Sequence, residues 1–326
     1  MNLAESTIKL KFGGVAMGLA RKDLLGLEDL TQEDIELILD NAKSMKEVLG
    51  RSIKKVPTLR GKLVVNLFYE PSTRTKSSFS LAAKRLSADG MSISAKSSSV
   101  VKGESLVDTA RTLRSLGADA VVMRHGVPGA AKLLAETVEI PVLNAGDGAH
   151  EHPTQALLDL FTIQDKKESI AGQEVAIVGD IKHSRVARSN IWGLNKLGAK
   201  VRLVGPSTLM PERIEDFDVD VYNDLEKGLK DVDVAYLLRI QRERQDKGFF
   251  PTIREYAKFF GVREKHLKLA KEDALIMHPG PINRGIEISS QLAYDEQSVI
   301  EEQVANGVAI RMALLYLLIE GGTKDE

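Results

Sequence analysis

Apolar and polar positions along this chain follow two spacings, one typical of helices and one typical of buried strands. Residues 31–49 open with Thr31 and Asp34, a capping pair, and then place apolar side chains every three or four positions, which predicts an amphipathic helix. Short apolar runs rich in β-branched residues predict strands at 62–68, 120–123, 142–144, 175–179, 201–205, 234–238 and 275–278. Helix-length segments separate most of these runs, so the pattern predicts an α/β fold with mostly parallel sheets flanked by helices.

The length of the chain predicts two domains, because 326 residues exceed the usual size of one hydrophobic core. A boundary falls near residues 145–172, where glycines and Pro153 precede a predicted helix at 154–163. We place one domain at residues 1–152 plus 303–326 and the other at 153–302, with the helix 154–163 bridging them. Residues 299–319 have helical spacing, which puts Val304, Val308, Met312 and Leu315 on one face.

Charge and cysteine content narrow the classes of function. The 45 basic and 46 acidic residues nearly cancel, and neither sign forms a long block, so we expect no nucleic-acid partner and no membrane-surface partner. The absence of cysteine excludes disulfides, thiolate nucleophiles and cysteine-type zinc sites. With no secretory-type apolar segment near residue 1, we expect a cytoplasmic protein.

The first candidate for chemistry is residues 68–75, FYEPSTRT, which directly follow a predicted strand. A helix start that offers free backbone N–H groups, three hydroxyls and an arginine suits a phosphate dianion. The alternative is an ordinary Ser or Thr helix cap beside a solvated arginine. Neither G-x-x-x-x-G-K-[ST] nor G-x-G-x-x-G occurs, so a nucleotide site of those kinds is not predicted.

This F-x-E-x-S-T-R-T motif resembles the carbamoyl-phosphate signature of the carbamoyltransferase family, and later motifs follow in the family's order over roughly residues 25–320. The resemblance implies the carbamoyltransferase fold, in which residues 1–152 plus 303–326 bind carbamoyl phosphate and residues 153–302 bind aspartate. It implies transfer of the carbamoyl group to the amine of L-aspartate through a tetrahedral intermediate, a step of pyrimidine biosynthesis. It also implies that no cofactor and no metal take part.

The resemblance assigns the carbamoyl-phosphate site residue by residue: Ser72, Thr73, Arg74, Thr75, Ser98, Arg124, His152, Gln155, Pro279 and Gly280. Thr75, Arg124 and His152 would donate to the developing oxyanion. Gln155, in the H-P-T-Q motif, would hold the carbamoyl amide. The carbonyl groups of Pro279 and Gly280 would accept from the carbamoyl NH₂.

The amino-acid site is implied by a second set of matches. The run R-x-Q-x-E-R at 239–244 resembles the family's aspartate-specific loop, in which Arg239 would bind the β-carboxylate and Gln241 would support it. Arg185 would bind the α-carboxylate. Lys102 would meet both substrates from a neighbouring subunit, and it completes the implied catalytic set with Arg74, Thr75, Arg124 and His152. The family therefore implies a homotrimer with shared active sites, and a larger assembly with regulatory or dihydroorotase chains is left open.

Several alternatives stay open at this stage. His150 and His152 could suggest a metal site, although a convincing third ligand is lacking. The run 239–244 could be an ordinary charged loop, the serine-rich stretch around Ser98 a solvated one, and Pro279-Gly280 an ordinary turn. An ornithine-specific enzyme is a rival, although the serine-methionine-glycine loop and H-C-L-P motif of that branch are absent. The remaining rivals are a non-catalytic phosphate-binding paralogue and a Rossmann-type oxidoreductase.

Overall fold

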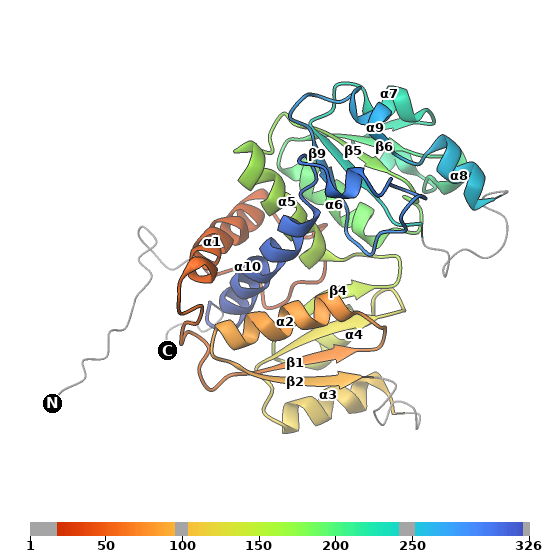
Figure 1. The fold of residues 1–326 in the computed structure, drawn as a ribbon. Helices are drawn as coiled ribbons and strands as arrows, with labels where there is room; N and C mark the ends of the chain where they lie inside the picture. Colours follow the sequence, from red (N-terminus) through yellow and green to blue (C-terminus); the bar gives the residue numbers. More distant parts are fainter. Residues whose placement is uncertain (1–17, 95–103, 241–251, 322–326) are drawn as a thin grey trace.

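The computed structural model describes residues 18–94, 104–240 and 252–321, which form two parallel β-sheets flanked by helices (Figure 1). The first sheet has the order β2 (Asp89–Ser94), β1 (Leu63–Phe68), β3 (Ala120–His125) and β4 (Val142–Asp147). The second has the order β7 (Asp220–Tyr222), β6 (Lys200–Val204), β5 (Glu174–Val178), β8 (Val234–Leu237) and β9 (Leu275–Met277). Every strand pair in both sheets is parallel. The predicted α/β fold is confirmed.

The seven strands expected from apolar runs are all present, within a few residues of their predicted ends. The sequence did not predict β2 and β7. Both lie at the edges of their sheets, and both carry mostly exposed or half-buried side chains. An edge strand has an open side, so its sequence need not form a continuous apolar run.

Helices cover the faces of both sheets. Thr31 and Asp34 form the expected capping box at the start of the first helix. The helices are α1 (Gln32–Gly50), α2 (Thr73–Arg85), α3 (Leu106–Ser115), α4 (Ala130–Thr137), α5 (Pro153–Lys167), α6 (Arg185–Lys196), α7 (Leu225–Leu229), α8 (Ile253–Phe259), α9 (Glu264–Leu267) and α10 (Ile300–Ile319), with short 3₁₀ turns at Ser207–Leu209, Ile214–Asp216 and Leu292–Tyr294.

Two long helices tie the halves of the molecule together. Helix α5 packs against α6 on one side and against α1 and α10 on the other, while α10 also packs against α2 (Figure 1). The C-terminal helix therefore returns to the first half of the chain, although the boundaries at residues 152 and 303 stay a prediction.

The prediction that Val304 belongs to a buried apolar face of α10 is wrong, because Val304 is 56% exposed. Met312 and Leu315, predicted on the same face, are fully buried. The helix is buried on nearly all sides in its later turns, so it has no single apolar face. Its first turns instead border a cavity, and Val304 lines that cavity. Among the described residues, α10 is also the helix long and apolar enough to cross a membrane by length and composition, and 72% of its most apolar stretch is buried within the molecule.

Candidate active site

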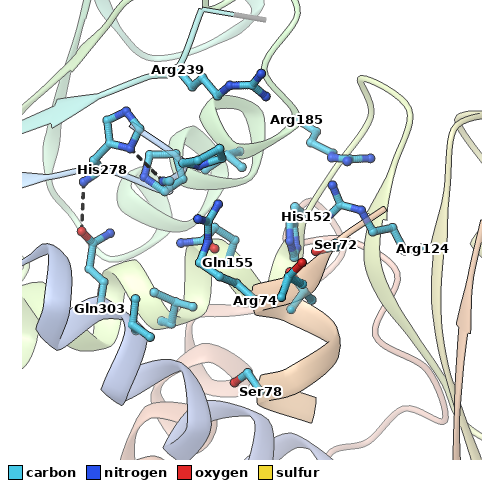
Figure 2. Close-up of a pocket in the computed structure, with 18 of the residues that line it drawn as sticks. Ser72, Arg74, Ser78, Arg124, His152, Gln155, Arg185, Arg239, His278 and Gln303 are labelled. Atoms are coloured by element: carbon cyan, nitrogen blue, oxygen red, sulfur yellow. Dashed lines mark hydrogen bonds between the residues drawn. The ribbon is translucent and has the colours of Figure 1, made fainter. Parts of the chain in front are cut away.

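A cavity of about 690 Å³ lies where the carboxyl ends of strands from both sheets meet. Ligands commonly bind at this edge of parallel α/β sheets. All predicted site residues that the structure describes line this cavity: Ser72, Thr73, Arg74, Thr75, Arg124, His152, Gln155, Arg185, Arg239, Pro279 and Gly280. Figure 2 shows Arg239, which follows β8 of the second sheet, across the cavity from Ser72 and Arg74 at the start of α2. The predicted residues Ser98, Lys102 and Gln241 lie outside the described residues.

The start of α2 offers groups that suit an anion. Ser72 occupies the N-cap position, yet its side chain makes no capping hydrogen bond. Ser105 and Ser184, the N-cap residues of α3 and α6, both accept such a bond. Ser72 is therefore not an ordinary helix cap, and its hydroxyl remains with the first backbone N–H groups of α2 for a ligand.

Arg74 lies against the turn at Gly280, which comes from the second half of the chain. A Cβ atom placed on Gly280 would lie 2.9 Å from the guanidinium carbon of Arg74, and Gly280 has a φ of +64°. The positive φ favours glycine there, and the absence of a side chain lets the guanidinium approach the turn closely. Desolvation and the positive charge of Arg239 lower the pKa of Arg74. The cavity is thus strongly cationic, which favours anionic ligands.

Glu70 joins two of the predicted arginines. Its Oε2 lies 3.3 Å from Arg124 Nε and 2.8 Å from Arg185 Nη2. Arg124 belongs to β3 and Arg185 begins α6, so this carboxylate links the two halves of the molecule. Arg185 was expected to bind a substrate carboxylate, and in this structure its partner is a carboxylate of the protein. Arg185 is buried, with only 3% of the residue exposed.

His152 lies at the N-cap position of α5. Its backbone N–H donates to Ser189 Oγ at 2.9 Å, and the residue is buried. Burial, and then the nearby charges of Arg124, Arg185 and Arg311, lower the pKa of His152 well below its usual value. A neutral imidazole can donate one hydrogen bond to an oxyanion without adding a charge that would have to be desolvated.

The cavity also has polar walls that the sequence alone did not identify: Glu70, Ser78, His278, Gln303 and Arg311. Arg311 is buried and donates to Ser78 Oγ and to the carbonyl of Gly307, both at 3.0 Å. Burial lowers the pKa of Arg311 to about 10. The available signal was Arg311, which interrupts the apolar run at 308–319 of the C-terminal helix.

Among the described residues, one group of side chains has its potential metal-binding atoms close enough together to bind a metal ion. Candidate ligand atoms of Glu28, His150 and Glu151 lie within 4.8 Å of one another. The Glu151 carboxylate, however, already accepts from the backbone N–H of Leu27 at 2.7 Å and from Ser189 Oγ at 2.7 Å. His152 is not in the group, so the pairing of His150 with His152 considered above does not form this cluster. That no metal takes part in the reaction stays a prediction.

Comparisons with known proteins agree with this arrangement. Residues 22–165 match the family model described as aspartate/ornithine carbamoyltransferase, carbamoyl-P binding domain. Residues 171–318 match the model for the Asp/Orn binding domain of the same family. Together the two matches cover both sheets and the helices that line the cavity.

Individual relatives are similar over nearly the whole chain. The aspartate carbamoyltransferase catalytic subunit of Halothermothrix orenii is 64% identical over 310 residues, which are 95% of this chain and 99% of that protein. Aspartate transcarbamoylase from Trypanosoma cruzi, solved with carbamoyl phosphate, is 32% identical with a TM-score of 0.85, covering 91% of this chain and 95% of that one. Ornithine carbamoyltransferase from Pyrococcus furiosus is 32% identical with a TM-score of 0.84, covering 94% and 99%. The chain with this cavity therefore belongs to the aspartate/ornithine carbamoyltransferase family.

Proposed function

We propose that this chain transfers the carbamoyl group of carbamoyl phosphate to the amine of L-aspartate, giving N-carbamoyl-L-aspartate and phosphate. The observation that carries the proposal is that one cavity holds both the start of α2 at Ser72 and the guanidinium groups of Arg185 and Arg239. The helix start suits a phosphate, and the two guanidinium groups suit two carboxylates. A role in pyrimidine biosynthesis and a cytoplasmic location are part of the same proposal.

The phosphate end of the donor would lie at the start of α2. There the backbone N–H groups, the hydroxyls of Ser72 and Thr73 and the guanidinium of Arg74 converge on the cavity. The positive end of the α2 dipole adds attraction for a dianion. The carbonyl carbon of the donor would then lie near Arg124 and His152, which line the same cavity.

Carbamoyl phosphate is an activated acyl donor, so the proposed reaction needs no covalent nucleophile from the protein. The aspartate nitrogen attacks the carbonyl carbon, and a C–N bond forms. The bond between that carbon and the bridging phosphate oxygen then breaks, and the departing phosphate takes the proton that the amine loses. Thr75, Arg124 and neutral His152 would stabilise the oxyanion between these two steps, while the cavity holds both reactants at the correct distance.

Aspartate is favoured over ornithine because of charge. Aspartate has two carboxylates, and two arginines from the second half of the chain line the cavity. They are Arg239 and Arg185, whose Nη2 pairs with Glu70 while its Nη1 has no hydrogen-bond partner among the described residues. Ornithine has one carboxylate and a second ammonium group, which Arg239 and Arg74 would repel. The fold itself does not decide between them, because a similar protein from Pyrococcus furiosus is an ornithine carbamoyltransferase.

An amine panel tests the proposal directly. The purified chain would be incubated with labelled carbamoyl phosphate and L-aspartate, L-asparagine or L-ornithine, and labelled product and free phosphate would be measured together. We expect turnover with aspartate, and little with asparagine, which lacks the β-carboxylate. Arg239→Met should raise the KM for aspartate by roughly 30-fold, the loss expected for a charge-assisted hydrogen bond of about 2 kcal/mol.

Arg60→Met is the matched control, because Arg60 is an exposed arginine that does not line the cavity. Its KM for aspartate should equal that of the wild type. Preferential turnover of ornithine, or no carbamoyl transfer to any amine, would overturn the proposal.

We propose in addition that the active unit is a homotrimer in which Ser98 and Lys102 of one subunit complete the cavity of its neighbour. Support comes from the family resemblance of residues 97–104, of which 97–103 lie outside the described residues. Arg74→Ala and Lys102→Ala chains should each be inactive alone. Mixed trimers of the two should recover part of the activity, because some cavities then receive both intact residues. Absence of rescue, or a monomeric native mass, would contradict this arrangement.

A further inference from the structure

A buried carboxylate beneath the cavity organises two of its walls. Asp159, on α5, is fully buried and accepts four side-chain hydrogen bonds. Its Oδ1 accepts from Gln155 Nε2 at 3.0 Å and from Gln303 Nε2 at 2.7 Å. Its Oδ2 accepts from Asn190 Nδ2 at 3.0 Å and from the Tyr236 hydroxyl at 2.7 Å. One oxygen therefore faces residues that line the cavity, and the other faces residues that support the fold.

The first consequence concerns the orientation of Gln155. A glutamine amide has a donor end and an acceptor end, and either can face a ligand. An ionised carboxylate only accepts hydrogen bonds, so Asp159 holds the NH₂ end of Gln155 away from the ligand. The carbonyl oxygen of Gln155 is the end that remains for the cavity, which this residue lines.

The second consequence reaches the turn after β9. Because Gln303 donates its NH₂ to Asp159, its Oε1 is free to accept from the backbone N–H of His278 at 2.9 Å (Figure 2). His278 Nδ1 in turn accepts from the backbone N–H of Gly280 at 2.8 Å. A chain of hydrogen bonds thus runs from Asp159 through Gln303 and His278 to Gly280.

This series of hydrogen bonds leaves the turn at residues 279–281 without a free backbone donor. Pro279 and Pro281 have no backbone N–H, and the N–H of Gly280 is held by His278. The backbone of residues 279–281 therefore presents only carbonyl oxygens to a ligand. Together with the carbonyl oxygen of Gln155, this part of the cavity wall offers hydrogen-bond acceptors and no backbone donors.

We infer that Asp159 is a positioning residue: it turns the carbonyl oxygen of Gln155 toward the cavity beside the carbonyl oxygens of the 279–281 turn, and so selects a donor whose acyl carbon carries an NH₂ group over acyl phosphates of the same shape. The inference rests on the proposed function and deepens it. Acetyl phosphate has the size and charge of carbamoyl phosphate, but its methyl group cannot donate. Buried acceptors left without donors cost free energy, so the wall would discriminate against it.

The test is the ratio of kcat/KM for carbamoyl phosphate to that for acetyl phosphate, at saturating L-aspartate. Asp159→Asn keeps the size of the side chain but adds a donor, which lets the amides of Gln155 and Gln303 reverse. We expect this ratio to fall roughly tenfold or more, the effect of one misplaced hydrogen bond of about 1.4 kcal/mol. The rate with acetyl phosphate should change far less.

Tyr236→Phe is the matched control. It removes a hydrogen bond from the other oxygen of Asp159, and Tyr236 does not line the cavity. A purely structural role of Asp159 would lower the thermal stability of both variants and leave the ratio unchanged in both. Our inference predicts a changed ratio in Asp159→Asn and an unchanged one in Tyr236→Phe.

Gln303→Met provides a second route if Asp159→Asn does not fold, since it breaks only the arm toward His278. A folded Gln303→Met chain should also lose selectivity for carbamoyl phosphate. An active wild type whose variants keep the wild-type ratio would overturn this inference alone. A wild type that makes no N-carbamoyl-L-aspartate would overturn the proposed function, and the inference with it.

Discussion

Two histidines near the start of α5 differ in the protonation state that the fold favours. Burial, followed by the charges of nearby arginines, lowers the pKa of His152. A hydrogen bond to Asp147 raises the pKa of His150. Among the described residues, the buried Nδ1 of His152 has no hydrogen-bond partner. The proton of its neutral ring is therefore best placed on Nε2, where it can be donated to an oxyanion.

We expect an NMR titration of ¹⁵N-labelled histidine side chains to show opposite shifts for these two residues. His152 should stay neutral as the pH falls through about 6.5, the ordinary value, whereas His150 should remain protonated above it. Stability that depends on neutral His152 is fully present above about 6.5. It is lost progressively as the pH falls from that value toward the lower pKa of the folded state, since in this window only the unfolded chain takes up a proton. His152→Asn and His150→Asn assign the signals. A His152 signal that titrates near 6.5 would contradict the neutral donor.

The residues predicted from the sequence share one property, which is that each belongs to a short contiguous motif. Ser72 and Arg74 lie in the short motif that follows β1, and Arg239 lies in the motif that follows β8. Asp159 and Gln303 have no such context. They lie far apart in the sequence, and they form a hydrogen bond only when α5 and α10 pack together and bury them. Buried polar contacts of this kind depend on the tertiary fold, which a local pattern does not contain.

At the scale of elements, α1 depends on its cap. The Thr31 side chain accepts from the N–H of Asp34 at 3.1 Å, and the Asp34 side chain accepts in return from the N–H of Thr31 at 3.2 Å. Thr31→Ala should lower the free energy of unfolding by about 1 kcal/mol, the usual value of a lost N-cap. Urea denaturation followed by circular dichroism measures this.

Thr137→Ala is the control for the cap, because the exposed Thr137 hydroxyl donates to the carbonyl of Leu133 within its own helix, α4. It should be nearly neutral, since alanine is the better helix former. Equal stability of Thr31→Ala and the wild type would show that packing of α1 against α10, and not the cap, holds the first turn.

Strand prediction depended on how deeply each strand is buried, and not on its place in the sheet alone: β4 and β9 lie at sheet edges, yet they are fully buried and were predicted. The central strands β1, β3, β5 and β8 are covered on both faces, so their sequences are almost entirely apolar. The edge strand β2 reads DGMSIS, has no fully buried residue, and resembles a loop by composition. It becomes a strand because the fold places it beside β1, with which it pairs in parallel. The sequence of β2 alone does not contain that information.

At the scale of the whole molecule, Glu70 is the carboxylate that connects the two sheets through Arg124 and Arg185. Glu70→Gln keeps the shape of the side chain but removes its charge, leaving the buried Arg185 guanidinium without its counter-charge. Breaking one partner of a fully buried pair costs about 3–5 kcal/mol. The Glu70 side chain is 26% exposed, so we expect a smaller loss, about 2 kcal/mol. Chemical denaturation measures it, with Glu139→Gln as the control, because the Glu139 side chain is 87% exposed.

Phosphate binding to Glu70→Gln distinguishes two possible roles of Glu70. A ligand that binds the folded protein raises the free energy of unfolding by RT ln(1 + [L]/Kd), so the shift in melting temperature reports the affinity for phosphate. If Glu70 mainly neutralises Arg124 and Arg185, then its removal strengthens the positive field of the cavity. Inorganic phosphate should then raise the melting temperature of Glu70→Gln more than that of the wild type. If Glu70 instead mainly holds the two arginines in the geometry that anions need, phosphate should raise it less. We predict the larger shift, since Arg185 is fixed by its own burial beside Gly146 and does not need the carboxylate to stay in place.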